Sequence, residues 1–174
     1  MTRRRASTLL FAIAAALLAP ASAGAQVSDT AVKAAFIPKF ARYVTWPAAA
    51  RNVGPLAICI IGEDPFGSAL DKAAASQSVD GRAFVVKRFS SASGASVCSI
   101  AFVDGTHTGE TLAALGRRPI LTVTDARGSG QRGVIHFAIV GGRVRFFIDN
   151  REAQARGLTI SSRLLALAIG VNQK

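Results

Sequence analysis

The sequence predicts an α/β domain with a mainly parallel sheet, flanked by helices, and a C-terminal antiparallel hairpin at the sheet edge. Residues 56–61 form a short continuous apolar run, which is typical of a strand buried on both faces. Such runs alternate with segments of helical spacing, and this alternation favours right-handed crossovers between parallel strands. Near the C-terminus, residues 134–140 and 143–149 are separated only by Gly141 and Gly142, which is a strong local signal for a hairpin.

The first helix is expected between residues 29 and 44, where mostly apolar residues recur at helical spacing. Pro38 lies inside this pattern and is expected to kink the helix or divide it into two pieces, because proline lacks a backbone donor. Trp46 should end the pattern, since it precedes Pro47 and the residue before a proline is disfavoured in a helix.

The middle of the chain predicts alternating strands and helices. The strand at 56–61 stops at Gly62, and a helix should then begin with Asp64 as its N-cap and Pro65 as its first residue. The other elements expected before the hairpin are strands at 83–86, 100–103 and 119–123 and a short helix at 111–115.

In the second arm of the hairpin, side chains should alternate between the two faces of the sheet. A short helix should follow and end at Arg156 and Gly157, and Ser161 or Ser162 should cap a last helix. The arm places three apolar residues on one face and three others on the opposite face: Val144, Phe146 and Ile148 against Arg143, Arg145 and Phe147.

The N-terminus has the three parts of a secretory signal peptide. Three arginines at 3–5 precede an uncharged apolar run at 8–19, and small residues follow at 20–25. We expect cleavage between Ala25 and Gln26, with cleavage after Ala23 as the alternative. A retained membrane anchor is disfavoured, because a spanning helix needs about 20 apolar residues. The expected organisation is therefore a signal peptide at 1–25 and a single exported domain at 26–174 that works outside the cytoplasm.

The chain is strongly basic, with a formal net charge of +11 that falls to +8 once the three arginines at 3–5 leave with the signal. A basic balance can indicate nucleic-acid binding, but export and the scattered placement of the basic residues argue against a nucleic-acid partner. A solvated arginine-rich surface is the simplest interpretation. Anionic lipid, cell-wall polymer or an acidic protein surface are the other counter-charges available outside the cytoplasm.

Two cysteines, Cys59 and Cys98, follow the signal. In an oxidising compartment an even pair favours a disulfide, while two buried free thiols in neighbouring strands are the alternative. A metal site is disfavoured, because His107 and His136 are far from the cysteines and lack ligand spacing.

The residues give no marked catalytic signature, so we expect no enzyme activity and no cofactor. Residues 128–133 match G-x-G-x-x-G, but the segment that follows predicts a strand, whereas a dinucleotide site needs a helix there. A hydrolase built around Asp104 and His107 remains a hypothesis, as does a small-ligand sensor with a crevice near Gly62, Thr124 and Asp125.

Several segments together resemble the YfiR family of small periplasmic proteins, and they cover nearly the whole mature chain in order. The most distinctive are the Trp46-Pro47 helix end, the two cysteine positions and the Leu-x-Ile-Ser-Ser-x-Leu-Leu ending at 158–165. The others are 32–37, 40–45, 58–62, 64–67, 81–82, 98–103, 120–123 and the Arg145-Phe146 arm.

The resemblance implies a dimeric, non-enzymatic regulator. Such proteins bind the periplasmic domain of an inner-membrane diguanylate cyclase and hold it inactive, which lowers cyclic di-GMP and biofilm formation. The cyclase is released from these proteins by an outer-membrane lipoprotein or by redox misfolding of the repressor. The resemblance also places the family's shared cysteine pair on Cys59 and Cys98, which supports the disulfide.

Aromatic residues are the expected anchors of a partner surface. Among the aromatic residues of the first helix and its end, Phe36 and Phe40 fit the core better, while Tyr43 and Trp46 are the expected exposed anchors. Arg145 and Phe147 are further candidates on the hairpin. Relatives commonly have Glu-Ile-Asn where this chain has 147–149, and Pro38-Lys39 replaces a more helix-friendly pair, so the partner here need not be the same sensor.

Overall fold

The computed structural model describes residues 28–50, 54–126 and 130–173. The helices are α1 (Asp29–Phe40), α2 (Ser68–Ala75), α3 (Thr108–Leu115), α4 (Asn150–Ala155) and α5 (Ser162–Leu165), with 3-10 turns at Ala41–Tyr43, Ala48–Ala50 and Ala92–Val97. The strands are β1 (Val44–Thr45), β2 (Leu56–Gly62), β3 (Ser78–Val79), β4 (Arg82–Phe89), β5 (Ile100–Asp104), β6 (Leu121–Asp125), β7 (Ile135–Val140), β8 (Arg143–Asp149), β9 (Thr159–Ile160) and β10 (Gly170–Asn172).

The predicted α/β class is confirmed. Eight strands form one sheet in the order β10-β8-β7-β6-β5-β2-β4-β3, and a separate antiparallel pair joins β1 to β9. The pairs among β4, β2, β5, β6 and β7 are parallel, as crossover connections require, and β7 with β8 is the antiparallel hairpin. Gly141 and Gly142 both have positive φ, which the tight hairpin turn needs. Beyond β8, the short strand β10 adds a parallel edge that the sequence did not predict.

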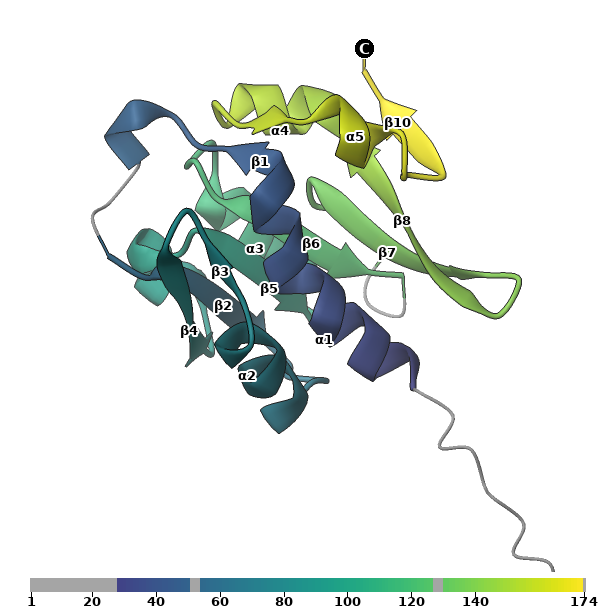
Figure 1. The fold of residues 1–174 in the computed structure, drawn as a ribbon, viewed down its shortest axis with the longest axis horizontal. Helices are drawn as coiled ribbons and strands as arrows, with labels where there is room; N and C mark the ends of the chain where they lie inside the picture. Colours follow the sequence, from purple (N-terminus) through teal and green to yellow (C-terminus); the bar gives the residue numbers. More distant parts are fainter. Residues whose placement is uncertain (1–27, 51–53, 127–129, 174) are drawn as a thin grey trace, which may run out of the picture.

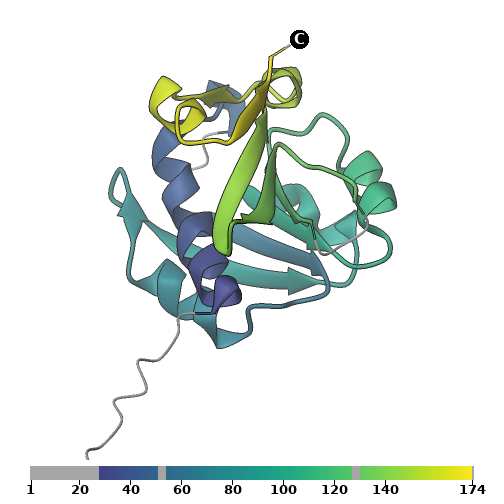
Figure 2. The same cartoon turned by 90° about the vertical axis from the view of Figure 1, so that its right-hand side faces the viewer.

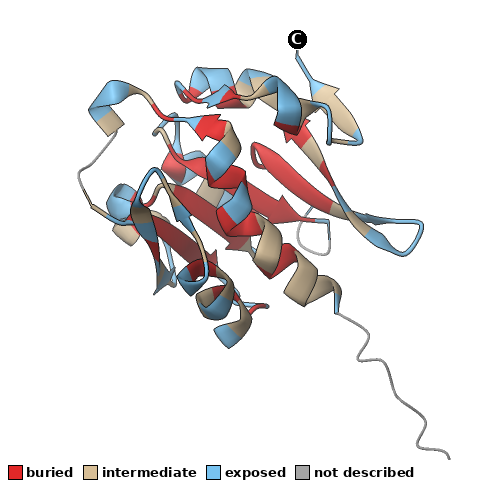
Figure 3. Cartoon of the chain, viewed as in Figure 1, coloured by how far each residue is buried: buried red, intermediate tan, exposed pale blue. Residues whose placement is uncertain are grey.

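Helices cover the two faces of the sheet unequally. Figure 1 shows α1 running across one face, with α2 beside it, while α3 lies behind the sheet. The larger apolar cluster lies under α1 and α2 and extends from β4 to β8, whereas the smaller one lies between α3 and the strands β2 and β5. The buried residues in Figure 3 accordingly concentrate in the central strands, and the tip of the hairpin is exposed.

An aromatic cluster joins α1 to the hairpin. Phe36 and Phe40 are one helical turn apart, and both lie against Phe137 of β7 and Phe146 of β8. The shortest of these contacts joins Phe40 and Phe146, whose ring centroids lie 5.3 Å apart in an edge-to-face arrangement. Phe40 is fully buried and Phe36 partly so, as expected for core residues.

The first helix differs from its prediction. Pro38 does not divide it, because the α-helix continues to Phe40 and only then tightens into a 3-10 turn at Ala41–Tyr43. Helical spacing was wrong for Val44, which belongs to β1 and pairs with Ile160 of β9. The helix begins where Ser28 accepts a hydrogen bond from the backbone N–H of Ala31, a normal N-cap arrangement.

The predicted cap of the second helix was also wrong. Helix α2 starts at Ser68 after Gly67, which has a positive φ of 48°, so Asp64 and Pro65 precede the helix. Asp64 instead accepts hydrogen bonds from the backbone N–H groups of Phe66 and Gly67 and holds a turn. Its other oxygen accepts from Arg88 of β4, which ties this turn to the sheet.

A buried ion pair joins α1 to the end of β6. The Lys33 ammonium contacts the Asp125 carboxylate, and both side chains are almost fully buried, with 0% and 3% of their surface exposed. The register places Asp125 opposite Phe137, on the face that α1 covers. Burying a charge is costly unless it is paired, so each group depends on the other.

We expect Lys33→Met to lower the free energy of unfolding by about 3–5 kcal/mol, because it leaves the Asp125 carboxylate buried without this ammonium. Lys39→Met is the matched control, since Lys39 lies exposed on the same helix and its loss should change stability by at most about 0.5 kcal/mol. Urea unfolding of the three proteins measures both effects. Equal stabilities of the two variants would show that the pair does not contribute.

Candidate functional site

The four residues expected to contact a partner lie in three different places. Tyr43, in the 3-10 turn after α1, is half-buried at the rim of a cavity of about 150 Å³ on the α1 face. We call this cavity the α1 pocket. Its lining is mostly apolar and its rim is basic, with the residues Phe36, Lys39, Phe40, Arg42, Tyr43, Phe146, Leu164 and Leu167.

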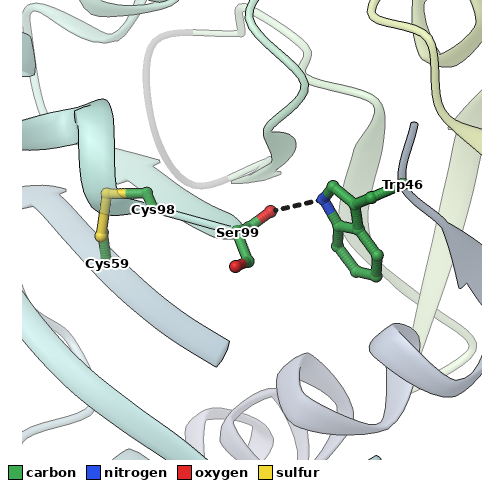
Figure 4. The surroundings of a disulfide bond; sticks show 4 residues. All are labelled: Trp46, Cys59, Cys98 and Ser99. Atoms are coloured by element: carbon green, nitrogen blue, oxygen red, sulfur yellow. Dashed lines mark hydrogen bonds between the residues drawn. A yellow bond between two sulfur atoms is a disulfide. The ribbon is translucent and has the colours of Figure 1, made fainter. Parts of the chain in front are cut away.

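Trp46 is not exposed as expected, because only 9% of its surface is accessible. Its indole N–H donates a hydrogen bond to the backbone oxygen of Ser99 at 3.3 Å (Figure 4). Ser99 directly follows Cys98, so this hydrogen bond ties the Trp46 side chain to the residue after the bridged cysteine. Trp46 also lines a cavity of about 350 Å³, together with Cys98 and Arg118.

The predicted disulfide between Cys59 and Cys98 is confirmed, and the alternative of two free thiols is wrong. Cys59 lies in β2 and Cys98 just before β5, with their Cα atoms 5.8 Å apart. Both belong to the smaller apolar cluster under α3. The bridge therefore crosslinks two adjacent central strands inside a buried layer.

Arg145 and Phe147 lie on β8, on the face of the sheet opposite the α1 pocket. Phe146 faces α1, and the alternation of a strand sends its two neighbours to the other side. Arg145 is exposed, while Phe147 is half-buried beneath the guanidinium of Arg132, whose carbon lies 4.9 Å from the ring centroid. Tyr43 and Phe147 therefore cannot belong to one flat contact surface.

Phe147 belongs to a row of side chains that crosses three strands. Thr124 of β6 lies opposite His136 of β7, and His136 lies opposite Phe147 of β8. His136 is 97% buried, and its Nδ1 lies 2.8 Å from the Thr124 hydroxyl oxygen. The same oxygen accepts a hydrogen bond from the backbone N–H of Gly133. Burial lowers the pKa of His136 below its ordinary value of 6.5; the charges of Arg132 and Lys33 also lower it, while Asp125 opposes them.

The sequence missed this row as a unit. The sequence argued only against His136 as a metal ligand, and the structure shows this imidazole packed on the sheet. The available signal was its position between Ile135 and Phe137. Side chains alternate along a strand, so these two point to one face of the sheet and His136 points to the other. Nothing in the sequence placed Arg132 over Phe147, since that contact depends on the path of the loop before β7.

A family model for YfiR/HmsC-like proteins matches residues 30–169, most of the chain. The chain belongs to the YfiR/HmsC-like family. Proteins of this family are periplasmic and act as regulators rather than enzymes. The match runs from the first turn of α1 to the residue before β10. Comparison with curated proteins finds no significant match.

The hydrolase hypothesis finds no support in the surroundings of His107. The Nδ1 of His107 lies 3.2 Å from the carboxylate of Glu110, and the imidazole is 76% exposed. Asp104 accepts a hydrogen bond from the backbone N–H of Gly105. Among the described residues, no hydroxyl or thiol is hydrogen-bonded to His107, as the nucleophile of a hydrolytic triad would be.

The other two sequence hypotheses concern loops at the strand ends. Thr124 and Asp125 are buried and point to opposite faces of β6, so they do not line a common crevice near Gly62.

The end of the G-x-G-x-x-G segment at 128–133 leads into the strand β7, as predicted, and not into a helix. Gly128 and Ser129 lie outside the described residues. The expected cleavage position at Ala25 and Gln26 also lies outside them. None of the helices between Ser28 and Gln173 that the structure describes is long and apolar enough to cross a bilayer.

Removing the disulfide should destabilise the domain. The bridged cysteines are 39 residues apart, and closing a loop of this length contributes about 4 kcal/mol in the chain-entropy model. We expect the double variant Cys59→Ala, Cys98→Ala to unfold at lower urea, with a loss of about 2–4 kcal/mol. Reductant should destabilise the wild-type protein and leave the double variant unchanged. A reductant-insensitive wild-type protein would contradict the expectation.

The lowered pKa of His136 makes stability depend on pH. Below about pH 6.5 the unfolded chain protonates this imidazole while the folded protein keeps it neutral, so the unfolded state binds more protons. The free energy of unfolding should therefore fall as the pH drops from 7 through 6.5, until the folded-state pKa is reached. Urea titrations at several pH values should show a weaker decline for His136→Asn. His107→Asn is the control, and a wild-type decline unchanged in His136→Asn would contradict the assignment.

Proposed function

We propose that this protein is a periplasmic repressor that binds the periplasmic sensor domain of an inner-membrane signalling protein, a diguanylate cyclase. Holding the cyclase inactive lowers cyclic di-GMP and biofilm formation. Membership of the YfiR/HmsC-like family is the observation that carries this proposal. The signal-like residues 1–25 and the buried disulfide agree with an oxidising compartment outside the cytoplasm.

The α1 pocket is the surface that we propose for the cyclase. It has the features of an interface hot spot, because an apolar depression is surrounded by polar groups that can exclude water. Tyr43 presents an amphipathic ring at the rim, and Leu167 is the most exposed large apolar side chain of the described residues, at 61%. An apolar side chain of the partner would fill the depression.

The charge around the α1 pocket indicates the chemistry of the partner. Lys39 and Arg42 are exposed at its rim, and the expected mature chain has a net charge of +8. An acidic surface around an apolar anchor would complement this arrangement and speed association. Repression further requires that the pocket bind the inactive conformation of the cyclase more tightly than the active one.

Two further parts of the proposal concern assembly and release. We propose that the protein is a homodimer, which sedimentation velocity of the mature chain tests directly. We also propose that an outer-membrane lipoprotein or reduction of the Cys59–Cys98 bridge releases the cyclase. One chain path supports coupling of the bridge to the α1 pocket. Trp46 follows Arg42 of the pocket by four residues, and its indole is hydrogen-bonded to Ser99, the residue after Cys98.

Deleting the gene should raise cellular cyclic di-GMP and surface attachment, and the wild-type gene should restore both. Leu167→Asp should fail to restore them, because it places a carboxylate at the apolar pocket; affinity for the purified sensor domain should fall at least about tenfold. Val140→Asp is the matched control, since Val140 is a half-exposed apolar residue at the hairpin tip. Mass spectrometry of cyclic di-GMP, at equal periplasmic protein levels, measures the outcome.

The two comparisons test separately whether the protein represses the cyclase and which surface makes the contact. Unchanged cyclic di-GMP in the deletion strain would contradict the repressor itself. Full repression by Leu167→Asp, with repression lost in Val140→Asp, would keep the repressor and move its contact surface to the hairpin.

A further inference from the structure

The face of the sheet opposite α1 contains a cavity that the proposed function does not use. It has a volume of about 390 Å³, within the range of small-molecule sites, and we call it the His136 pocket. Its lining residues come from β7, β8, β10 and the segment before β7, at the edge of the sheet where β10 pairs with β8. Figure 2 shows these strands in green and yellow. The residues that line the pocket include Arg132, His136, Phe147, Asp149, Gly170 and Asn172.

His136 presents a hydrogen-bond donor to this cavity. The Thr124 hydroxyl oxygen accepts from Gly133, and among the described residues its only other hydrogen-bond partner is Nδ1 of His136, which leaves this nitrogen to accept the hydroxyl proton. Nδ1 is therefore the acceptor, and the neutral imidazole carries its proton on Nε2. Nε2 has no partner among the described residues, yet every fully enclosed side-chain nitrogen and oxygen in them has one. The Nε2–H group is consequently open to the pocket.

Arg132 supplies a second donor group, and this one is charged. Its guanidinium stacks over the Phe147 ring at 4.9 Å and forms no ion pair within the described residues. It lies near enough to His136 for its charge to lower the pKa of that imidazole. Gly170 leaves room for this stack, because a Cβ there would lie 2.9 Å from the Phe147 ring. The charged guanidinium of Arg132 and the neutral N–H group of His136 thus line the same cavity.

The pocket is also lined by an acidic residue, Asp149, which lies two residues beyond Phe147 on β8. Asp149 accepts hydrogen bonds from the backbone N–H of Glu152 and from the amide of Asn172, at 2.7 and 2.9 Å. A carboxylate retains further lone pairs after two such bonds, and it repels a second negative charge. A ligand that spans the pocket therefore needs its negative group at Arg132 and a hydrogen-bond donor near Asp149.

We propose that the His136 pocket binds a small monocarboxylate that also carries a hydroxyl or amino donor. The carboxylate accepts from the Arg132 guanidinium and from Nε2–H of His136, and the donor group faces Asp149 and Asn172. A planar carboxylate matches the guanidinium fork, and a single charge suits a site that contains an acidic residue. This site is independent of the cyclase-binding surface, because the two lie on opposite faces of the sheet.

The two histidines make the test direct, because His107 is exposed and is not among the residues that line the pocket. Lactate, added to the purified mature protein, should shift the imidazole carbon-bound proton resonances of His136 in a saturable way and leave those of His107 in place. Arg132→Gln should weaken binding at least about tenfold, the effect of losing a hydrogen bond to a charged group. Arg42→Gln, which removes an exposed charge at the α1 pocket instead, should bind as the wild type does.

Two further probes define the ligand class. Lactamide, which has the same shape without the charge, should produce no saturable shift. Inorganic phosphate should bind more weakly than lactate, because Asp149 disfavours a dianion. The proposal is overturned if lactate gives no saturable shift, if Arg132→Gln binds it like the wild type, or if lactamide or phosphate binds as tightly. Because Arg132 is exposed, its substitution should leave the His107 resonances unchanged, which checks folding in the same spectrum. These outcomes do not depend on any cyclase.

Discussion

The packing of α1 across the sheet is the constraint on which the other features of this molecule depend. Phe36 and Phe40 lie against Phe137 and Phe146, so one helix near the N-terminus holds the C-terminal hairpin against the parallel strands. The Lys33–Asp125 pair adds a buried polar tie between the same helix and the last central strand. Because this face is filled by α1, the alternation of β7 and β8 sends His136 and Phe147 to the other face.

The opposite face is divided by what covers it. Under α3, the strands β2 and β5 bury a small apolar cluster that contains the disulfide. Over β6, β7 and β8 the row of Thr124, His136 and Phe147 is partly polar, and the cavity above it remains. The two halves of this face therefore differ in role: one crosslinks the centre of the fold, and the other presents hydrogen-bonding groups to a small volume.

The sequence predicted the elements that local chemistry dictates. The apolar run of β2, the Gly141-Gly142 turn and the alternation of β8 were correct, because each depends on neighbouring residues alone. Errors arose where tertiary pairing prevailed. Val44 fits helical spacing but joins β9, and β10 is a strand only because β8 offers it an edge. Asp64 resembles a helix cap but holds a turn that Arg88 ties to β4.

By itself, the sequence determined the α/β class, the resemblance that places the chain in its family, and the disulfide as the favoured state of its only two cysteines. Tertiary structure decided which side chains share a surface. It buried Trp46 beside Cys98, separated Tyr43 from Phe147 on opposite faces, and brought Arg132 over the ring next to His136. The physical reason is that spacing along a strand or helix fixes the direction of a side chain, while its neighbours depend on strand order and loop path, which arise from packing across the whole chain.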